Sequence, residues 1–417
     1  MRVLYGHCCR FQVLWAALAV SMTIGFTIQL FGVSFQKRAS LSQLPPTPWA
    51  PPLPKAEQEE AEGRPGHRCQ PRRHLVFLKS HKTGSSTIIN LLHRFGDARG
   101  LRFALPARYQ FSYPNLFQAR RVKGWHPRGR PFDILCHHMR FNLPEVQKVM
   151  PPDSFYFSIV RHPVSLAESA FSYYRSVVPA FRRAGTLPQF LASPQRFYRP
   201  SERGNHYARN LLWFDFGLDP PAAPGLAPIQ AALATLERTF HLVLLTEHMD
   251  ESLVLLRDAL CWGEEDILAF RHNFRSPESV RPLAPVEAAR LQAWNNLDWH
   301  LYTHFNRSFW ERAERFGRAR LAREVGALRQ RRAERMQQCL QGGGPLEAGQ
   351  IADERIRPFQ FGQAPILGYV LRPSLDPEWQ ALCQRMVTPE LQYKDLLDAK
   401  QFPPPPQGNG SQAGGVR

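Results

Sequence analysis

The sequence lacks the short spaced motifs by which many enzymes hold a metal ion. None of its seven cysteines stands in a CxxC pair, and no HExxH sequence occurs, so neither a zinc ribbon nor a zinc hydrolase helix is predicted. It also lacks an Asp-x-Asp pair of the kind that binds the metal of a nucleotide sugar. These absences argue against a zinc enzyme and a metal-dependent glycosyltransferase, and we expect that no metal is required.

A Walker loop is missing too, because GxxxxGK[ST] puts lysine after the last glycine, whereas Lys82 precedes Gly84. What is present is a buried-strand pattern at 75–78, a loop rich in hydroxyls, and an apolar helical repeat that we expect to end at Gly96 in a left-handed cap. Backbone N–H groups at such a strand-to-helix junction bind anions. The residues predicted to form this anion loop are Ser80, His81, Lys82, Thr83, Gly84, Ser85, Ser86 and Thr87. The alternative is a plain connector whose hydroxyls only cap the helix.

The chain has 417 residues, 43% of them hydrophobic, with a formal charge of +18 and a pI near 10.1. This length accommodates one large or two modest domains. The positive charge predicts anionic partners, which include nucleic acid, an acidic membrane, or an anionic co-substrate. Charge alone does not distinguish these partners, but the location of the protein can.

An uncharged apolar stretch near the N-terminus is long enough to cross a bilayer and longer than the apolar part of a cleaved signal peptide. The segment behind it is rich in proline and charge, which is typical of a stem. We therefore predict a cytosolic tail (1–10), a transmembrane signal anchor (11–35), a stem (36–68), a lumenal globular domain (69–402) and a disordered tail (403–417). A lumenal body makes nucleic acid an unexpected partner.

Cysteines and sequons agree with a lumenal body. The sequons at Asn306 and Asn409 are candidate glycosylation sites. Five cysteines fall in the predicted lumenal part, namely Cys69, Cys136, Cys261, Cys339 and Cys383. Because five is odd, at least one is free or pairs with a second chain, which leaves a homodimer open. The sequence does not predict the pairing.

Further strand-and-helix units follow the anion loop, which predicts an α/β fold with a parallel central sheet. A strand at 132–136 ends at His137 and His138, and alternation on a strand allows at most one of these to address a given cleft. A strand at 155–160 is followed by Arg161, at the edge where ligands collect in such sheets, and by Ser169 on the next helix. The pair can hold a second anionic group, or it can be a surface arginine and an exposed serine.

Two later regions complete the pattern. Residues 181–230 read as a loop-rich insertion or lid, with scattered prolines and aromatic residues. A strand and helix follow from His241 to Trp262, and 285–338 has helical periodicity with an arginine-rich face.

Several long blocks, in order, resemble the Golgi galactose 3-O-sulfotransferase family. They are FLKSHKTGSST, CHHMRF, FSIVRHPVSLAESAFSYY, LVLLTEHMDESLVLL, WNNLDWHLYTHFNRSFW and ILGYVLR. The resemblance covers about 69–402, and LRFALPARYQFSYP and HYARNLLWFDFG are most similar to the branch that acts on core 1 O-glycans. It implies a sulfotransferase fold related to P-loop NTPases and a type II protein of the Golgi membrane with a lumenal catalytic domain.

The resemblance also implies a reaction and residue roles. The donor is 3′-phosphoadenosine 5′-phosphosulfate (PAPS), and the acceptor is the 3-hydroxyl of a β-galactose on a glycoprotein glycan. Lys82 matches the family's phosphosulfate lysine, and Arg161 with Ser169 match its 3′-phosphate pair. The loop departs from relatives at Ser80 and Gly84, where Thr and Ala are common; neither change removes a cation.

Removing the acceptor proton calls for a general base. We predict His138, with His137 and His81 in reserve. The competing interpretations are a lumenal glycan kinase, for which acidic metal ligands are missing near the loop, and a non-catalytic glycan-binding protein.

Overall fold

A computed structural model describes residues 69–222, 225–362 and 365–404. The predicted tail, anchor and stem, the sequon at Asn409, and all but two residues of the C-terminal tail lie outside these residues. No helix within the described ranges combines the length and the apolar character needed to span a membrane.

Five parallel strands form the central sheet, in the order β2-β3-β1-β4-β5. Along the chain they are β1 (Leu75–Leu78), β2 (Phe103–Ala104), β3 (Ile134–Leu135), β4 (Phe155–Val160) and β5 (Leu242–Leu245). The prediction of a parallel α/β sheet is confirmed. Their near-continuous apolar sequences are typical of strands that are buried on both faces.

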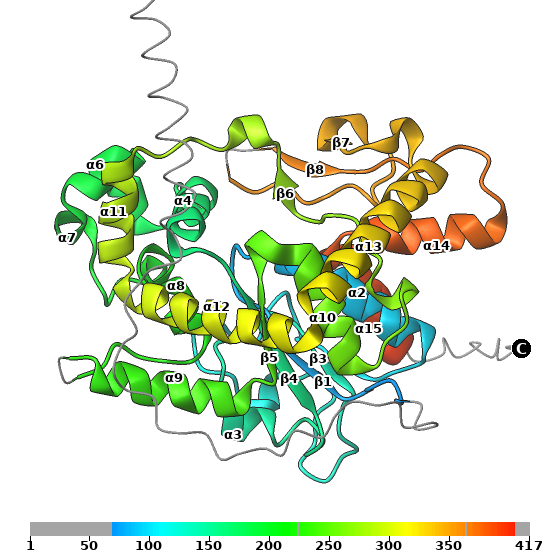
Figure 1. The fold of residues 1–417 in the computed structure, drawn as a ribbon, viewed down its shortest axis with the longest axis horizontal. Helices are drawn as coiled ribbons and strands as arrows, with labels where there is room; N and C mark the ends of the chain where they lie inside the picture. Colours follow the sequence, from blue (N-terminus) through cyan, green and yellow to red (C-terminus); the bar gives the residue numbers. More distant parts are fainter. Residues whose placement is uncertain (1–68, 223–224, 363–364, 405–417) are drawn as a thin grey trace, which may run out of the picture. The chain divides into compact units, whose positions relative to one another are not determined.

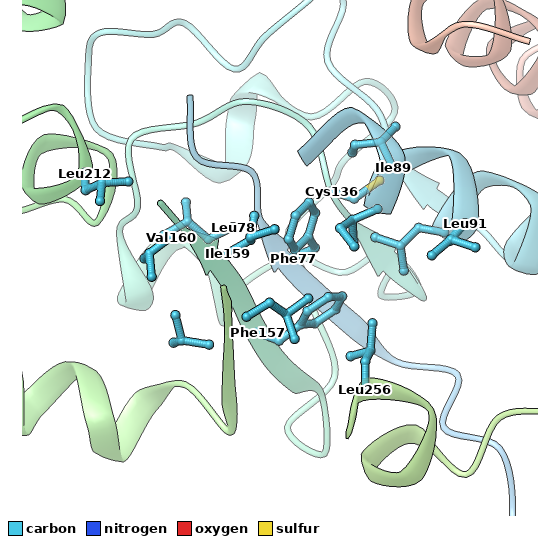
Figure 2. Close-up of a cluster of buried hydrophobic side chains, with 14 of the residues drawn as sticks. Phe77, Leu78, Ile89, Leu91, Cys136, Phe157, Ile159, Val160, Leu212 and Leu256 are labelled. Atoms are coloured by element: carbon cyan, nitrogen blue, oxygen red, sulfur yellow. The ribbon is translucent and has the colours of Figure 1, made fainter. Parts of the chain in front are cut away.

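All four residues of β1 pair with the first four residues of β4. Phe77 of β1 lies opposite Phe157 of β4, and their ring centroids are 4.9 Å apart. Figure 2 shows both rings in one apolar cluster that also contains Ile89 from the following helix. Because β1 is the middle strand, the loop that leaves it is held by strands on both sides.

Helix α2 (Ser85–Ala98) follows the anion loop and packs against α15 (Glu390–Gln401), far along the chain. Figure 1 shows these two helices side by side. The expectation of a left-handed cap at Gly96 is wrong, since the helix continues to Ala98 and Gly96 is helical. A β-carbon at Gly96 would lie 2.3 Å from the Phe103 ring, so this glycine permits close packing of α2 on β2.

The remaining helices surround the sheet and extend the fold. They are α3 (Leu143–Val146), α4 (Pro163–Tyr174), α5 (Pro179–Ala184), α6 (Leu187–Ala192), α7 (Pro194–Phe197), α8 (Leu211–Asp215), α9 (Ala227–Thr239), α10 (Met249–Leu260), α11 (Pro285–Trp294), α12 (Asn296–Phe316), α13 (Arg318–Cys339) and α14 (Pro377–Val387). The prediction that 181–230 is loop-rich is therefore only partly right. Three of its prolines, Pro188, Pro194 and Pro228, stand in the first turns of helices, where a missing N–H costs nothing.

A small antiparallel sheet, in the order β6-β8-β7, lies away from the central one (Figure 1). Its strands are β6 (Phe274–Arg275), β7 (Leu346–Glu347) and β8 (Ile366–Gly368). The middle strand β8 pairs with β7 on one side and with β6, from an earlier part of the chain, on the other.

Two disulfides tie distant segments together. Cys69 is bonded to Cys261 at the end of α10, and Cys339 at the end of α13 is bonded to Cys383 on α14. Among the described cysteines Cys136 is left as a buried thiol. This agrees with the odd count, which required at least one cysteine without a partner in the chain.

Candidate active site

Two adjoining cavities open where β1 and β4 end. The first has a volume of about 400 Å³ and lies between the anion loop, α4 and the segment 269–275. The second, of about 510 Å³, is bounded mainly by 356–369 and 387–392. Both volumes are of the size that small-molecule sites have. Side chains that include His81, Ser86, Tyr109 and His138 border both, so the cavities share a wall.

The anion loop carries two positive φ angles, at Lys82 (59°) and Gly84 (72°), directly before α2 begins at Ser85. This turn brings the backbone round to the N-terminus of α2. The first turn of a helix has N–H groups without intrahelical partners, so this end attracts negative charge.

The loop residues predicted to bind the anion divide into two groups. Those that line the first cavity are His81, Lys82, Gly84, Ser85, Ser86 and Thr87. Ser80 and Thr83 face inward instead: their hydroxyls lie 3.0 Å apart, and Thr83 Oγ1 donates to the Ser80 carbonyl at 3.1 Å. These two side chains shape the loop and do not contact the cavity.

Lys82 projects into the first cavity, with its ammonium 3.5 Å from the centre of the Tyr173 ring. Burial, followed by the nearby guanidinium groups of Arg275 and Arg161, lowers the pKa of Lys82 to about 7. A cation placed among cations without a close carboxylate partner is stabilised by an incoming anion.

Arg161 and Ser169 line the same cavity as Lys82. Arg161 follows β4 and donates from Nη1 to the Lys82 carbonyl oxygen at 3.0 Å, while Ser169 lies on α4. The structure therefore brings together the two anion sites that the sequence placed 79 residues apart.

Further arginines that the sequence analysis missed border this cavity, namely Arg271, Arg275 and Arg332. Arg275 forms a largely buried ion pair with Glu168, and Arg332 is paired with Asp250. Of the three arginines, this leaves Arg271 without an ion pair to a described residue. No motif marks these arginines, and the fold alone gathers them.

The buried carboxylate of Asp215 holds both the backbone and the ring of His81. Asp215 accepts from the His81 backbone N–H at 2.8 Å, contacts the ring Nδ1 at 3.0 Å and accepts from the Tyr113 hydroxyl at 2.8 Å. The His81 ring stacks on His138, with 3.9 Å between centroids. His81 thus joins the loop to the shared wall, and Asp215 is another residue that the sequence analysis did not identify.

His138 has a defined tautomer. Its Nδ1 lies 3.0 Å from the Lys79 carbonyl oxygen, which can only accept, so Nδ1 carries the proton and Nε2 accepts from Lys79 Nζ at 2.7 Å. Burial, followed by the proximity of His81 and Lys79, lowers the pKa of His138 well below its usual value. The ring is therefore neutral, with its lone pair directed at a lysine.

His137 points the other way, into the interior. Its ring lies 5.3 Å from that of His93, both rings are buried, and neither lines the two cavities. Burial lowers the pKa of His137 to about 3. The expectation that only one histidine of the pair faces the cleft is confirmed.

The second cavity is walled by aromatic rings, which include Tyr109, Tyr173, Tyr174, Phe361 and Tyr369. Tyr109 is 40% exposed and borders both cavities. Glu390, at the start of α15, contributes a carboxylate to this wall.

Asn306 lies half-buried within α12. Its glycosylation stays a prediction, as does that of Asn409.

Comparisons with known proteins identify the family of the chain. The family profile described as Galactose-3-O-sulfotransferase matches residues 15–401. The chain is 49% identical to human (Homo sapiens) galactose-3-O-sulfotransferase 4 and 50% identical to the Bos taurus protein of that name, with 94% of each chain covered. It is 42% identical to human galactosylceramide sulfotransferase, over 92% of this chain and 93% of that one.

The matched region contains the anion loop, the strand-end arginine and the shared histidine wall, and the similarity extends over nearly the whole chain. This chain belongs to the galactose-3-O-sulfotransferase family and is an enzyme of that family.

Proposed function

We propose that the chain transfers the sulfuryl group of PAPS to the 3-hydroxyl of terminal β-galactose on core 1 O-glycans (Galβ1-3GalNAc) of glycoproteins. The observation that carries this proposal is the pairing of a cationic cavity with an aromatic one across a single histidine wall. The first cavity suits an anionic nucleotide, and the second suits an uncharged sugar.

The donor fits the first cavity by charge. PAPS carries negative charge at its 5′ end, on the phosphosulfate, and at its 3′ phosphate. In the proposal Lys82 and the first N–H groups of α2 bind the 5′ end, while Arg161 and Ser169 bind the 3′ phosphate. The depressed pKa of Lys82 supports this assignment, because the bound anion restores the lysine charge.

Transfer is an in-line displacement. The acceptor oxygen forms a bond to sulfur while the bond between sulfur and the 5′-phosphate oxygen breaks, and the electron pair stays on the departing phosphate. Lys82 and the loop N–H groups stabilise the charge that develops there. The monoanionic sulfuryl group needs less neutralisation than a phosphoryl dianion, so the proposal requires no metal.

His138 is the general base of the proposal. Its Nε2 lone pair is engaged by Lys79, which also borders the donor cavity. An anionic donor competes for the Lys79 ammonium, and Nε2 then accepts the proton of the acceptor hydroxyl.

The acceptor lies against the tyrosines of the second cavity, whose ring faces suit the apolar face of galactose. The names of the relatives refer to galactose and to galactosylceramide; the choice of core 1 glycans rests on likeness to the first of these. The proposal also places the protein in the Golgi membrane, type II with a lumenal catalytic domain, through the apolar stretch 11–35.

The test uses the detergent-solubilised full chain, PAPS with labelled sulfate and a panel of galactosides that includes Galβ1-3GalNAc. We expect transfer to the 3-hydroxyl of core 1, and we expect Lys82→Ala to abolish it. Lys148→Ala, a change at an exposed lysine, is the matched control and should keep full activity.

Full activity in Lys82→Ala would overturn the mechanism. A wild-type chain that binds glycans but neither binds 3′-phosphoadenosine 5′-phosphate (PAP) nor transfers sulfate would instead support a glycan-binding protein.

A further inference from the structure

Glu390 connects the C-terminal helix α15 to the anion loop. Its Oε2 forms an ion pair with Lys79 Nζ at 3.1 Å and accepts from Ser86 Oγ at 3.0 Å, although these residues are about 300 positions away in the chain. The side chain is only 9% exposed and forms part of the wall of the aromatic cavity. Its other oxygen, Oε1, is buried without a hydrogen-bond partner among the described residues.

Lys79 needs such a carboxylate. Its side chain is 2% exposed, and a buried ammonium group without a counter-charge is strongly destabilised. The same ammonium donates to His138 Nε2 at 2.7 Å. Lys79 therefore lies between a carboxylate and an imidazole, with an ion pair to the first and a hydrogen bond to the second.

The histidine end of this chain of contacts is fixed as well. His138 Nδ1 donates to the carbonyl of Lys79 itself, so one lysine holds both ring nitrogens. Any movement of the Lys79 ammonium changes what Nε2 is bonded to. The position of that ammonium depends in turn on Glu390.

We propose that Glu390 is a positioning residue for sulfuryl transfer: its carboxylate holds the Lys79 ammonium at the boundary of the two cavities and, through it, orients the His138 ring. This inference rests on the proposed function. It extends the site to α15, because Lys79 borders the donor cavity, Glu390 borders the acceptor cavity, and Ser86 and His138 border both.

A role of this kind predicts a specific kinetic pattern. Glu390→Gln keeps the size of the side chain and an oxygen that can accept, but it removes the charge that retains the ammonium. We expect kcat to fall about 10- to 100-fold, the factor that a charge-assisted hydrogen bond commonly contributes. The affinity for PAP should not fall, because Glu390 does not border the donor cavity and a Lys79 ammonium released from it is freer to pair with the anionic nucleotide.

A double-mutant cycle distinguishes positioning from a separate effect of the carboxylate. If Glu390 acts through Lys79, the double variant Lys79→Met/Glu390→Gln is no slower than Lys79→Met alone. Losses that multiply would overturn the inference. Glu390→Asp, which restores the charge on a shorter side chain, should recover part of the activity that Glu390→Gln loses.

The matched control is Glu378→Gln, an exposed carboxylate in the first turn of the preceding helix α14, and it should leave kcat unchanged. Melting temperature and PAP affinity are measured for every variant. A Glu390→Gln protein that melts early, binds PAP weakly and keeps its kcat per folded molecule would show a merely structural residue and overturn the inference.

The two proposals fail in different ways. If the wild-type chain transfers no sulfate to any galactoside, the proposed function is wrong. If the wild-type chain is active and Glu390→Gln keeps kcat within about threefold, a smaller change than one such hydrogen bond contributes, only the role of Glu390 is wrong.

Discussion

The two cavities share the wall around His138, but different parts of the chain supply the rest of their linings. The cationic cavity takes its main groups from loops that leave neighbouring parallel strands, such as Lys82 after β1 and Arg161 after β4. The aromatic cavity is closed by segments from the last fifty or so residues of the described chain, 356–361, 367–369 and 387–392. In the proposed function, recognition of the charged nucleotide is thus tied to the sheet, whereas the acceptor surface can vary without disturbing it.

A substitution in the wall that the two cavities share gives the largest predicted loss of activity. We expect His138→Ala to lower kcat by about 10²- to 10⁴-fold, the usual contribution of a general base. Its neighbour provides the control: His137 faces the interior, so His137→Ala should keep kcat per folded molecule within about threefold. Steady-state transfer assays with a folded-fraction measurement test this, and equal losses in both variants would contradict the assignment of His138 as the base.

The cationic cavity should make the affinity for PAP depend on pH. Free Lys82 has a pKa of about 7, and a bound anion raises it, so binding takes up a proton above that pH. Affinity should therefore fall as pH rises above 7, by up to about tenfold per pH unit. The phosphates of PAP titrate near pH 6 and add little to this slope.

Calorimetric titration between pH 7 and 9 measures the slope. Lys82→Arg stays charged over this range and should bind with nearly constant affinity. An unchanged slope in that variant would assign the titration to another group.

A substitution at the edge of the aromatic cavity should weaken binding of the galactoside and leave PAP binding unchanged. It gives the smallest predicted effect. Phe359 borders only the acceptor side and is 61% exposed. We expect Phe359→Ala to raise KM for the galactoside about two- to tenfold, the contribution of one aromatic contact, with PAP affinity unchanged. Leu396→Ala, at a similarly exposed side chain on α15 that borders neither cavity, is the control. A matching rise in both variants would show that the cavity wall does not select the sugar.

The same contrast explains how much of the site the sequence reveals. Buried strands such as 75–78 and 155–160 are readable because an apolar run in an α/β chain has few other places to lie. Residues that follow the strands lie at the edge of the sheet, so the sequence alone could predict that Lys82, His138 and Arg161 lie near the cavity. The neighbours Asp215 and Glu390 could not be predicted, because each meets the loop through packing over more than a hundred residues.

Sequence patterns also misled where one residue type serves two purposes. Gly96 looked like a helix terminator, but it allows Phe103 to lie against α2. Pro188 and Pro194, in the stretch predicted to be loop-rich, instead stand in the first turns of helices. Both local rules hold in general. At these positions, however, packing against the glycine and the start of a helix at the prolines decided the structure.

The bond between Cys339 and Cys383 has a practical consequence for making the enzyme. It fastens α14 to α13 only a few residues before Glu390 begins α15. A host that keeps thiols reduced would yield a chain without this tether. Recombinant protein should therefore come from a secretory or periplasmic system, and the thiol content of each preparation should be determined before its kinetics are compared with those of another.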